Sequence, residues 1–296
     1  ARGRLSRGRL RAACAHALAA SDWTVTCTAS VGDDTFEEFV AGDFQRSRAT
    51  YYAAADGTLR TVQRSDVNLD GYPDLVQPNY YNGSTRLIDS TVWLGSASGL
   101  DPATRLSLPT VGAIASTAAD LNHDGYPDIA FCNHHDNTTY LTDSYVYWGR
   151  ATGFSIADRT PLPTTGCYGI ATADFDRDGW LDLVFTDYYD VDYNTSSYLY
   201  FGGATGFSTT RRTSLPTAGP IGACVGDLND DGHVDVMFPG YYTGASYSHS
   251  AYIFWGSATG PDPSSPDRTI PTLGGRGCSI ADLDADGDLD VVVNNH

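Results

Sequence analysis

An aspartate-rich motif of nine residues recurs five times along the chain at a nearly constant spacing. It reads Asp-x-Asp/Asn-x-Asp-Gly-x-x-Asp and occupies residues 66–74, 120–128, 174–182, 227–235 and 282–290. The first aspartates of successive motifs lie 54, 54, 53 and 55 residues apart. Self-similarity at a fixed stride of this length indicates a repeat architecture in which each repeat is one supersecondary unit.

Two further markers keep the same stride. A glycine ends an aromatic and β-branched segment at Gly95, Gly149, Gly202 and Gly256, and a Leu-Pro-Thr or Ile-Pro-Thr triplet begins at residues 108, 162, 215 and 270. In the third repeat these markers divide the chain into four segments of strand length, at residues 169–173, 181–186, 197–201 and 212–216. They are bounded by Gly, Pro or Asp, and none has sustained helical periodicity.

The predicted fold is therefore all-β, a β-propeller of four-stranded antiparallel blades in which the aspartate motif joins the first two strands of each blade. A single propeller domain is expected over residues 22–296, with a degenerate repeat at 22–57 and five calcium-loop repeats at 58–296, the last one incomplete. The degenerate repeat would supply strands at 22–27, 37–41 and 48–54. The blade number is predicted as five to seven. Either N-terminal strands complete the last blade, or the ring has blades beyond this chain.

Residues 1–21 differ from the rest of the chain. Arginines at positions 2, 4, 7, 9 and 11 precede a short apolar stretch at 12–20. This pattern indicates an arginine-rich leader or the remnant of a signal peptide.

The aspartate motif has the ligand spacing of a calcium loop. Side-chain oxygens stand at positions 1, 3, 5 and 9, the backbone carbonyl of position 7 adds another, and glycine at position 6 permits the sharp turn. The motif lacks the glutamate that an EF-hand carries at position 12, and strands rather than helices flank it, so a calcium-bound hairpin is expected. The predicted metal ligands are Asp66, Asn68, Asp70, Tyr72, Asp74, Asp120, Asn122, Asp124, Tyr126, Asp128, Asp174, Asp176, Asp178, Trp180, Asp182, Asp227, Asn229, Asp231, His233, Asp235, Asp282, Asp284, Asp286, Asp288 and Asp290.

The charge of the chain supports a bound cation. The formal net charge is −18, and half of the aspartates lie at the four side-chain ligand positions of the five loops. Carboxylates packed within a few ångströms of one another are strongly unfavourable without a cation. About five Ca²⁺ ions with a structural role are therefore predicted.

The five aspartate loops and the glycine marker resemble the FG-GAP, or VCBS-type, repeats of integrin α-chain propellers and of many bacterial surface proteins. The segment Phe201-Gly202-Gly203-Ala204-Thr205 is similar to the Phe-Gly…Gly-Ala-Pro signature, with Thr205 where proline often stands. The resemblance covers about residues 58–296. It implies a propeller with calcium loops on one face and ligand-binding loops on the other. Integrin-like rings usually have seven blades, and a fungal lectin of the Psathyrella type looks like the same architecture, so cell adhesion and glycan binding are consistent with the family.

A second regularity follows each aspartate loop. Six and seven residues after the last aspartate of the first four loops stand the pairs Tyr80-Tyr81, His134-His135, Tyr188-Tyr189 and Tyr241-Tyr242. Asparagine and aspartate follow them, including the sequons at Asn82, Asn137 and Asn194. Aromatic plates beside such polar groups commonly hold sugar rings, so these eight residues are the candidate ligand-binding residues. The alternative is that they pack between neighbouring blades.

The six cysteines have no CxxC spacing, which argues against zinc. Cys224 and Cys278 lie in apolar segments and are expected to be free and packed as small hydrophobes, whereas Cys132 and Cys167 are candidates for a disulfide. The acidic balance argues against nucleic acid, and the sequence lacks an apolar run long enough for membrane insertion.

Together these features indicate a calcium-binding recognition or adhesion module, secreted or at the cell surface, whose partner is a glycan or an extracellular protein. The alternatives are the propeller domain of a carbohydrate-active enzyme, such as a polysaccharide lyase or hydrolase, and a scaffold that binds no ligand. No nucleophile elbow, phosphate loop or zinc motif is present, so no catalytic residue is predicted and an enzyme is not expected.

Overall fold

The computed structural model describes residues 66–295, except residues 101, 191, 194 and 285, and four strands that precede them. The preceding strands form two antiparallel pairs, β1 (Ala15–Ala19) with β2 (Asp22–Thr26) and β3 (Ala49–Ala53) with β4 (Leu59–Gln63). Strands β2 and β3 coincide with two strands expected in the degenerate repeat. The expected strand at 37–41, and the leader at 1–21 apart from β1, lie outside the described residues.

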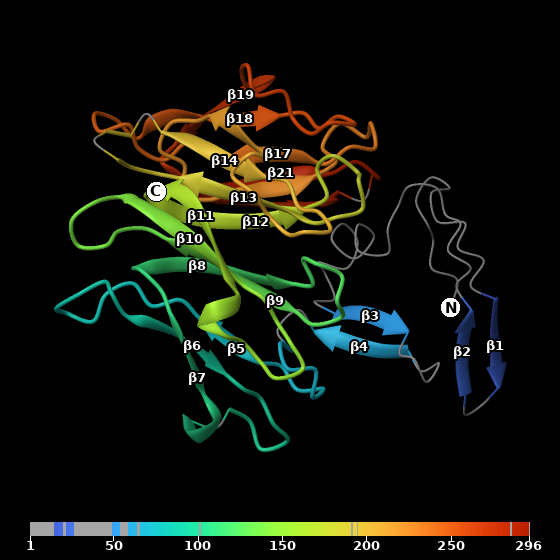
Figure 1. Ribbon diagram of the computed structural model, residues 1–296. Coiled ribbons are helices and arrows are strands. Elements are labelled where there is room, and N and C mark those ends of the chain that lie inside the picture. Colours follow the sequence, from blue (N-terminus) through green and yellow to red (C-terminus); the bar gives the residue numbers. More distant parts are fainter. Residues whose placement is uncertain are drawn as a thin grey trace.

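The aspartate repeats form five antiparallel sheets that follow one another along the chain (Figure 1). The first sheet contains β5 (Leu75–Gln77), β6 (Asp89–Trp93) and β7 (Leu106–Pro109). The second contains β8 (Ala113–Ala119), β9 (Asp128–Asn133), β10 (Leu141–Tyr147) and β11 (Arg159–Thr165). The third contains β12 (Cys167–Ala173), β13 (Asp182–Asp187), β14 (Ser196–Tyr200) and β15 (Arg212–Pro216). The fourth contains β16 (Cys224–Gly226), β17 (Asp235–Phe238), β18 (Ser248–Phe254) and β19 (Arg268–Leu273), and the fifth β20 (Gly275–Ala281) and β21 (Asp290–Asn295).

The all-β prediction is confirmed. The helical elements of the described residues are two short 3₁₀ turns, η3 (Pro102–Thr104) and η4 (Ile156–Asp158). Across these residues, no helix has the length and apolar character needed to cross a membrane. In the third sheet the four strands begin and end within two residues of the segments expected from the sequence. The propeller and its blade number remain predictions.

The first sheet differs from the four-stranded prediction. Strand β4 precedes the first aspartate loop, where the first strand of this sheet was expected, but it pairs with β3 instead of β5. Only residues 54–58 separate β3 from β4, so a local hairpin forms at little cost in loop closure. The first sheet therefore has three strands.

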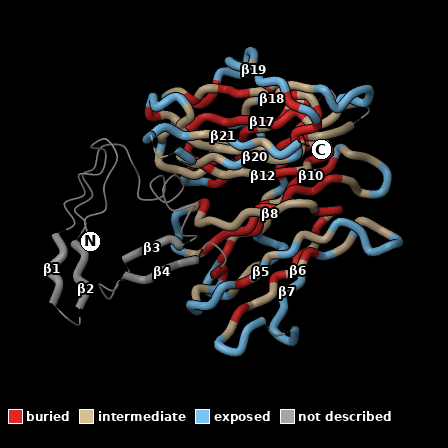
Figure 2. Tube along the Cα trace, turned by 180° about the vertical axis from the view of Figure 1, so that it is seen from behind, coloured by how far each residue is buried: buried red, intermediate tan, exposed pale blue. Residues whose placement is uncertain are grey.

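Successive sheets pack against each other through alternate side chains of their second strands. On β9, Ile129 and Phe131 pack with residues of the first sheet, whereas Ala130 and Cys132 pack with residues of the third. On β13, side chains likewise alternate between the second and fourth sheets. All residues of β9, β13 and β17 are buried, as expected for strands covered on both faces (Figure 2).

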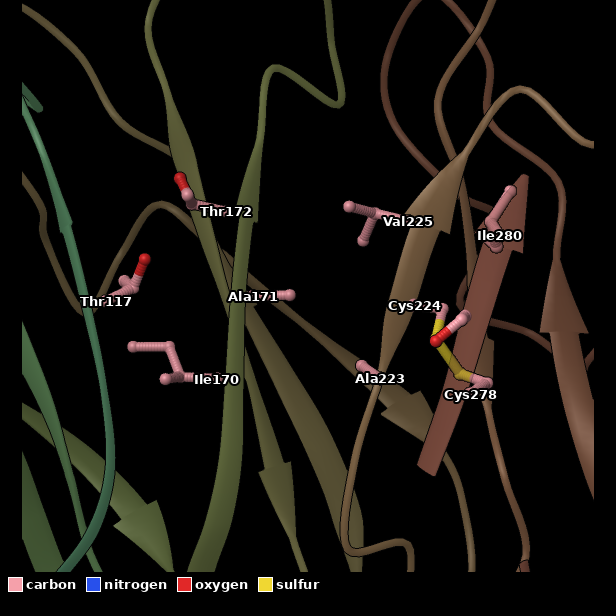
Figure 3. A pocket seen from close by; sticks show the side chains of 10 residues that line it. Thr117, Ile170, Ala171, Thr172, Ala223, Cys224, Val225, Cys278 and Ile280 are labelled. Carbon is pink, nitrogen blue, oxygen red and sulfur yellow. A yellow bond between two sulfur atoms is a disulfide. The ribbon is translucent and has the colours of Figure 1, made fainter. Parts of the chain in front are cut away.

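The first strands of the second to fifth sheets lie around a shared cavity of about 270 Å³. Its wall includes Thr117 of β8, Ile170 and Thr172 of β12, Val225 of β16 and Ile280 of β20 (Figure 3). These four strands therefore face a common space, with the later strands of each sheet further out.

Two disulfides join neighbouring sheets. Cys132 of β9 is bonded to Cys167 of β12, with 5.5 Å between the Cα atoms, which confirms the candidate pair. Cys224 of β16 is bonded to Cys278 of β20, with a Cα–Cα distance of 5.9 Å. The expectation that Cys224 and Cys278 are free was wrong because it considered each cysteine within its own apolar strand. The contact between β16 and β20 brings the two strands, and hence the two thiols, together.

Candidate functional site

The five aspartate loops are numbered 1 to 5 in chain order. Loops 2 to 5 join the first and second strands of their sheets, loop 1 precedes β5, and their described residues share several backbone features. The glycine at position 6 has a φ between 87° and 101° in all five, as its turn requires. Position 4 is also left-handed, although it is never glycine in loops 1 to 4, where Leu69, His123, Arg177 and Asp230 have φ between 55° and 59°. The sequence analysis missed this second left-handed residue, because side chains of four different kinds occupy it.

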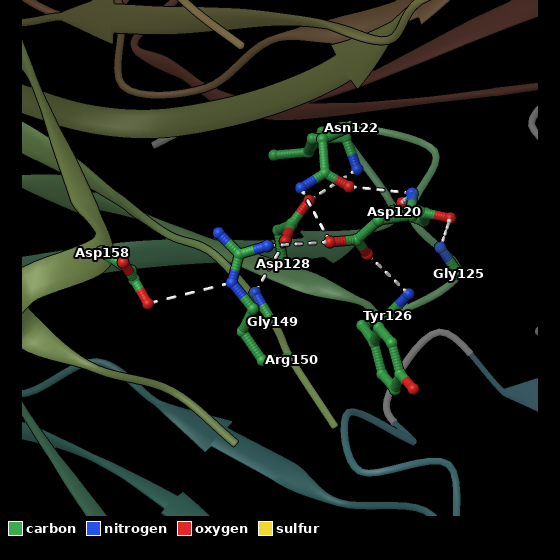
Figure 4. Close-up of polar contacts among 10 residues, drawn as sticks. Asp120, Asn122, Gly125, Tyr126, Asp128, Gly149, Arg150 and Asp158 are labelled. Carbon is green, nitrogen blue, oxygen red and sulfur yellow. Dashed lines mark hydrogen bonds and ion pairs between the residues drawn. The ribbon is translucent and has the colours of Figure 1, made fainter. Parts of the chain in front are cut away.

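Loop 2 illustrates how the aspartates hold the turn (Figure 4). The two carboxylate oxygens of Asp120 accept hydrogen bonds from the backbone N–H groups of Asp124 (3.1 Å) and Gly125 (2.9 Å). Asn122 Oδ1 accepts a second bond from the Asp124 N–H (2.9 Å), and Asp124 Oδ1 accepts one from the Tyr126 N–H (3.0 Å). The side chains at positions 1, 3 and 5 are thus directed into one turn. Loops 1 and 4 repeat this set of bonds.

The aspartate at position 9 ties the loop to the glycine marker. Asp128 Oδ2 accepts a hydrogen bond from the Leu121 N–H (2.8 Å), and its Oδ1 accepts one from the Gly149 N–H (2.7 Å). Asp74, Asp182 and Asp235 make the same pair of bonds in their sheets. A Cβ atom on Gly149 would lie 2.1 Å from the Pro127 carbonyl oxygen. The marker residue is therefore glycine, because a residue with a Cβ atom could not bring its backbone N–H within hydrogen-bonding distance of the Asp128 carboxylate without a clash.

Burial makes the ionised form of these position-9 aspartates costly. It raises the pKa of Asp128 to about 7, of Asp182 to about 8 and of Asp235 to about 6. Backbone N–H donors act in the opposite direction, and the neighbouring loop carboxylates raise the pKa values further. A divalent cation beside these groups would stabilise their ionised form.

The donor set fits a hard cation best in loops 3 and 5, where position 3 is aspartate. The carboxylates of Asp174, Asp176 and Asp182 each place an oxygen within 4.8 Å of the others, and Asp282, Asp284 and Asp290 do the same. Asp174 Oδ1 is buried and has no hydrogen-bond partner, so its lone pairs are available to a ligand. In loops 1, 2 and 4 the amide oxygen of an asparagine takes position 3. Ligands of this kind suit Ca²⁺.

The structure brings together the carboxylates predicted as ligands at positions 1, 3 and 9 of loops 3 and 5, and the ligand role of position 5 stays a prediction. At position 7 the backbone N–H donates to the position-5 carboxylate in all five loops, and the ligand role of its carbonyl stays a prediction. Neighbouring loops also touch, since the rings of His123 in loop 2 and Trp180 in loop 3 are stacked with centroids 4.4 Å apart.

The aromatic pairs follow the far ends of the second strands, away from the aspartate loops, and contact each other across sheets. The ring of Tyr80 lies 5.8 Å from that of His134 in the next sheet, and the ring of Tyr188 lies 6.0 Å from that of Tyr241. Four tyrosines that the sequence analysis did not single out connect the pairs: Tyr140, Tyr168, Tyr193 and Tyr247. We call these eight pair residues and four tyrosines the aromatic face.

Two arginines that the sequence analysis also missed lie on the aromatic face. The Arg86 guanidinium is 4.9 Å from the ring centroid of Tyr80 and 5.0 Å from that of Tyr81. The Arg276 guanidinium is 5.0 Å from the Tyr241 ring centroid and donates a hydrogen bond to the Tyr241 hydroxyl (3.0 Å). Neither arginine has a counterpart in every repeat, so the repeat pattern could not reveal them.

The aromatic face contains both buried packing residues and exposed residues that are available to a ligand. His134 is buried, and burial lowers its pKa to about 4, so it is a neutral packing residue at pH 7. Tyr81 and Tyr247, by contrast, keep 48% and 42% of their surface exposed.

The polar residues expected beside the rings make hydrogen bonds within and between the loops. Asn137 accepts a hydrogen bond from the Arg86 N–H (2.9 Å) and donates one to the Thr85 hydroxyl (2.9 Å), so it links two neighbouring sheets. Asn82 caps the turn at residues 84 and 85. Asn194 lies outside the described residues.

Asp187 stands where the first and second sheets have asparagine. Asn133 donates a hydrogen bond from Nδ2 to the Asp143 carbonyl (2.7 Å), and Asn79 does the same to the Asp89 carbonyl. Asp187 keeps one acceptor contact, from the Thr165 N–H (2.8 Å), but its other oxygen is buried without a partner. Burial raises the pKa of Asp187 well above its usual value of 3.8.

We expect Asp187→Asn to stabilise the protein by about 1–3 kcal/mol at pH 7.5, because an amide carries no charge that burial penalises and supplies the Nδ2 donor that Asn133 uses. The folded state holds the Asp187 proton more tightly than the unfolded state, so this site loses stability as the pH rises above about 3.8. The gain in unfolding free energy should therefore be near zero at pH 3.5 and grow towards pH 7.5. Denaturant unfolding at a series of pH values measures it, and a gain that is independent of pH would contradict this account.

The comparison with protein families agrees with the repeat pattern. Residues 66–131 and residues 120–185 each match the FG-GAP-like repeat family. A comparison with curated proteins finds no match. Among solved structures, the chain is similar to the V. cholerae biofilm matrix protein Bap1, with 16% sequence identity and a TM-score of 0.47 over 83% of this chain and 33% of that one. The chain thus corresponds to a third of the length of Bap1. The resemblance noted in the sequence is confirmed for the matched residues: residues 66–185 of this chain are FG-GAP-like repeats.

Proposed function

We propose that the protein is an extracellular recognition module whose aspartate loops bind calcium and whose aromatic face binds a glycan. Two disulfides, which are typical of oxidising compartments, support a location outside the cytoplasm. FG-GAP-like repeats support the calcium assignment. The single observation that carries the glycan assignment is the continuous set of ring contacts across the loops of the first four sheets.

Calcium is proposed at loops 1 to 5 through the side chains at positions 1, 3, 5 and 9 and the carbonyl at position 7. When bound, the ion supplies positive charge that offsets the clustered carboxylates. The residues themselves orient the ligands, since backbone N–H groups hold at least one carboxylate oxygen of each loop in place. The proposed role is structural, as a clamp on the turn between the first two strands of each sheet.

The proposed arrangement of the sheets is a propeller of five to seven blades, to which residues 22–296 contribute as one domain. Its support is the packing of each sheet on the next and the shared cavity beside β8, β12, β16 and β20. In this arrangement the loops that join first and second strands lie at one end of the blades, and the loops that join second and third strands lie at the other. Calcium and ligand would then bind at opposite faces.

The aromatic face has the chemistry of a sugar-binding surface. Partly exposed tyrosine rings offer apolar plates for the C–H faces of sugars, and tyrosine hydroxyls and arginine guanidinium groups offer hydrogen bonds. The rings come from several sheets, so the surface extends across more than one sugar. An oligosaccharide or polysaccharide is therefore the proposed ligand, rather than a monosaccharide held in one pocket.

We expect Tyr81→Ala and Tyr247→Ala each to weaken glycan binding about 3- to 10-fold, since a stacking contact is worth about 0.5–1.5 kcal/mol. A glycan array identifies the ligand for the wild type, and isothermal titration then gives the affinities of the variants. Tyr72→Ala is the matched control. Tyr72 is similarly exposed, at 40%, but belongs to aspartate loop 1, so its loss should leave glycan affinity unchanged. Binding that Tyr72→Ala weakens as much as the other two, or binding to a protein partner without any glycan, would contradict the proposal.

A further inference from the structure

Among the residues that the structure describes, an arginine lies at the position-5 carboxylate of two aspartate loops. In loop 2 the Arg150 Nη1 lies 3.4 Å from Asp124 Oδ2, and its Nε lies 3.8 Å from Asp158 Oδ2 (Figure 4). In loop 3 the Arg211 Nη2 lies 3.3 Å from Asp178 Oδ2. In both loops a guanidinium group therefore neutralises part of the charge that a calcium ion would neutralise.

Arg150 and Arg211 contact equivalent position-5 carboxylates, but they come from different positions in their repeats. Arg150 directly follows the marker Gly149, whereas the residue after the marker Gly202 is Gly203. A Cβ atom on Gly203 would lie 2.1 Å from Arg211 Nη1. The space that a side chain at position 203 would need is thus filled by Arg211, which comes from the connection between β14 and β15.

Loops 1 and 4 have an uncharged residue at the corresponding position. Ser96 follows the marker Gly95, and Ser257 follows the marker Gly256. Each serine hydroxyl donates a hydrogen bond to a carbonyl within its own turn, Ser96 to Gly99 and Ser257 to Gly260. The ligand sets of loops 1, 2 and 4 are otherwise alike, with aspartate at positions 1, 5 and 9 and asparagine at position 3.

The arginine changes what the position-5 carboxylate can offer to an ion. Oδ1 of Asp124 already accepts the Tyr126 N–H, and Oδ2 accepts the amide of Asn122 and faces Arg150. A positive charge a few ångströms from a divalent cation opposes its binding, and the same charge relieves the repulsion among the carboxylates when the ion is absent. The pairs are partly exposed, so both effects are modest.

We propose that the loops fall into two classes of calcium site. This inference rests on the proposed calcium binding. Loop 2, whose other ligands match those of loops 1 and 4, carries a built-in counter-ion, binds calcium more weakly than they do, and retains more of its stability without it. In loop 3 the aspartate at position 3 adds a carboxylate that offsets Arg211, so the comparison is made among loops 1, 2 and 4. Loops 1 and 4, which lack an arginine after the marker glycine, bind calcium more tightly and depend on it more. Among these three loops, loop 2 is therefore the least sensitive to calcium.

Arg150→Ser, which reproduces the residue of loops 1 and 4, tests the proposal by two readouts. Isothermal titration with Ca²⁺ alone should show one site becoming about 3- to 10-fold tighter, a size expected for removing one screened charge near the ion. In excess chelator the melting temperature should fall by about 2–4 °C, because the counter-ion of loop 2 is lost. Arg150→Lys, which keeps the charge, should stay close to the wild type in both measurements. Ser257→Arg should weaken one site by a similar factor.

The two readouts separate this inference from the proposed function. Calcium binding by the wild type, combined with an unchanged affinity and an unchanged chelated melting temperature in Arg150→Ser, overturns the two classes of site and leaves calcium binding intact. A wild type that binds no calcium overturns both. Arg150→Lys distinguishes the effect of charge from the effect of packing. If Arg150→Lys changes the calcium affinity and the melting temperature in chelator as much as Arg150→Ser does, the charge is not the cause and the proposal is overturned.

Discussion

Excess chelator is expected to lower the melting temperature of the protein by more than about 15 °C. A site that is saturated at 100 times its dissociation constant stabilises the folded state by about 2.7 kcal/mol, and several such sites act on one domain. For a domain of this size, each 1 kcal/mol corresponds to a shift of about 2–4 °C. Differential scanning calorimetry in calcium and in chelator measures the shift.

Recovery with different cations shows whether the loss of bound calcium causes the fall in melting temperature. Adding Ca²⁺ in excess over the chelator should restore the original melting temperature, and adding the same excess of Mg²⁺ should restore much less, because Mg²⁺ demands a strict octahedral geometry and retains its waters. A melting curve that is the same with and without chelator would mean that the aspartate loops hold their shape without an ion.

Gly149→Ala is expected to lower the free energy of unfolding by about 3–5 kcal/mol. The new Cβ would lie 2.1 Å from the Pro127 carbonyl oxygen, so the backbone must move away. That movement stretches the hydrogen bond of 2.7 Å from the Gly149 N–H to the buried Asp128 carboxylate. Denaturant unfolding in calcium measures the loss of stability.

Gly226→Ala provides a matched control for the loss of a glycine in a strand. A Cβ atom on Gly226 would lie 3.4 Å from the nearest atom, on Ile280, which is an ordinary contact. Its effect should stay below about 1 kcal/mol. Equal losses for Gly149→Ala and Gly226→Ala would show that the close approach at the marker glycine is not what makes it necessary.

The local parts of the fold could be predicted from the sequence because the aspartate motif recurs five times and the glycine and proline markers recur four times. In the third repeat, proline, glycine and aspartate bound every strand, and β12 to β15 lie where those residues placed them. The turn at Gly179 and the cluster of Asp174, Asp176 and Asp182 also follow from residues within one motif. Because the residues of one motif are close together in the sequence, few other arrangements of the turn are possible.

Contacts between segments that do not belong to one motif were harder to predict. The Cys224–Cys278 disulfide, the pairing of β4 with β3 and the position of Arg211 at Asp178 depend on which segments lie side by side. The marker Gly149 was recognised as the end of a strand, but its bond to Asp128 spans 21 residues and has no local signature. On the aromatic face, the pairs were visible in the sequence, whereas Tyr140, Tyr168, Tyr193 and Tyr247 are connected to them only by the packing of neighbouring sheets.

Counting the bound ions by native mass spectrometry tests the central claim most directly, because each aspartate loop is proposed to hold one calcium ion. The wild type should carry about five Ca²⁺ ions after exchange into calcium, and none after chelation. The double variant Asp174→Asn, Asp182→Asn should carry one ion fewer, since it removes two of the three converging carboxylates of loop 3. A wild type without bound calcium, or a double variant with an unchanged ion count, would contradict the account.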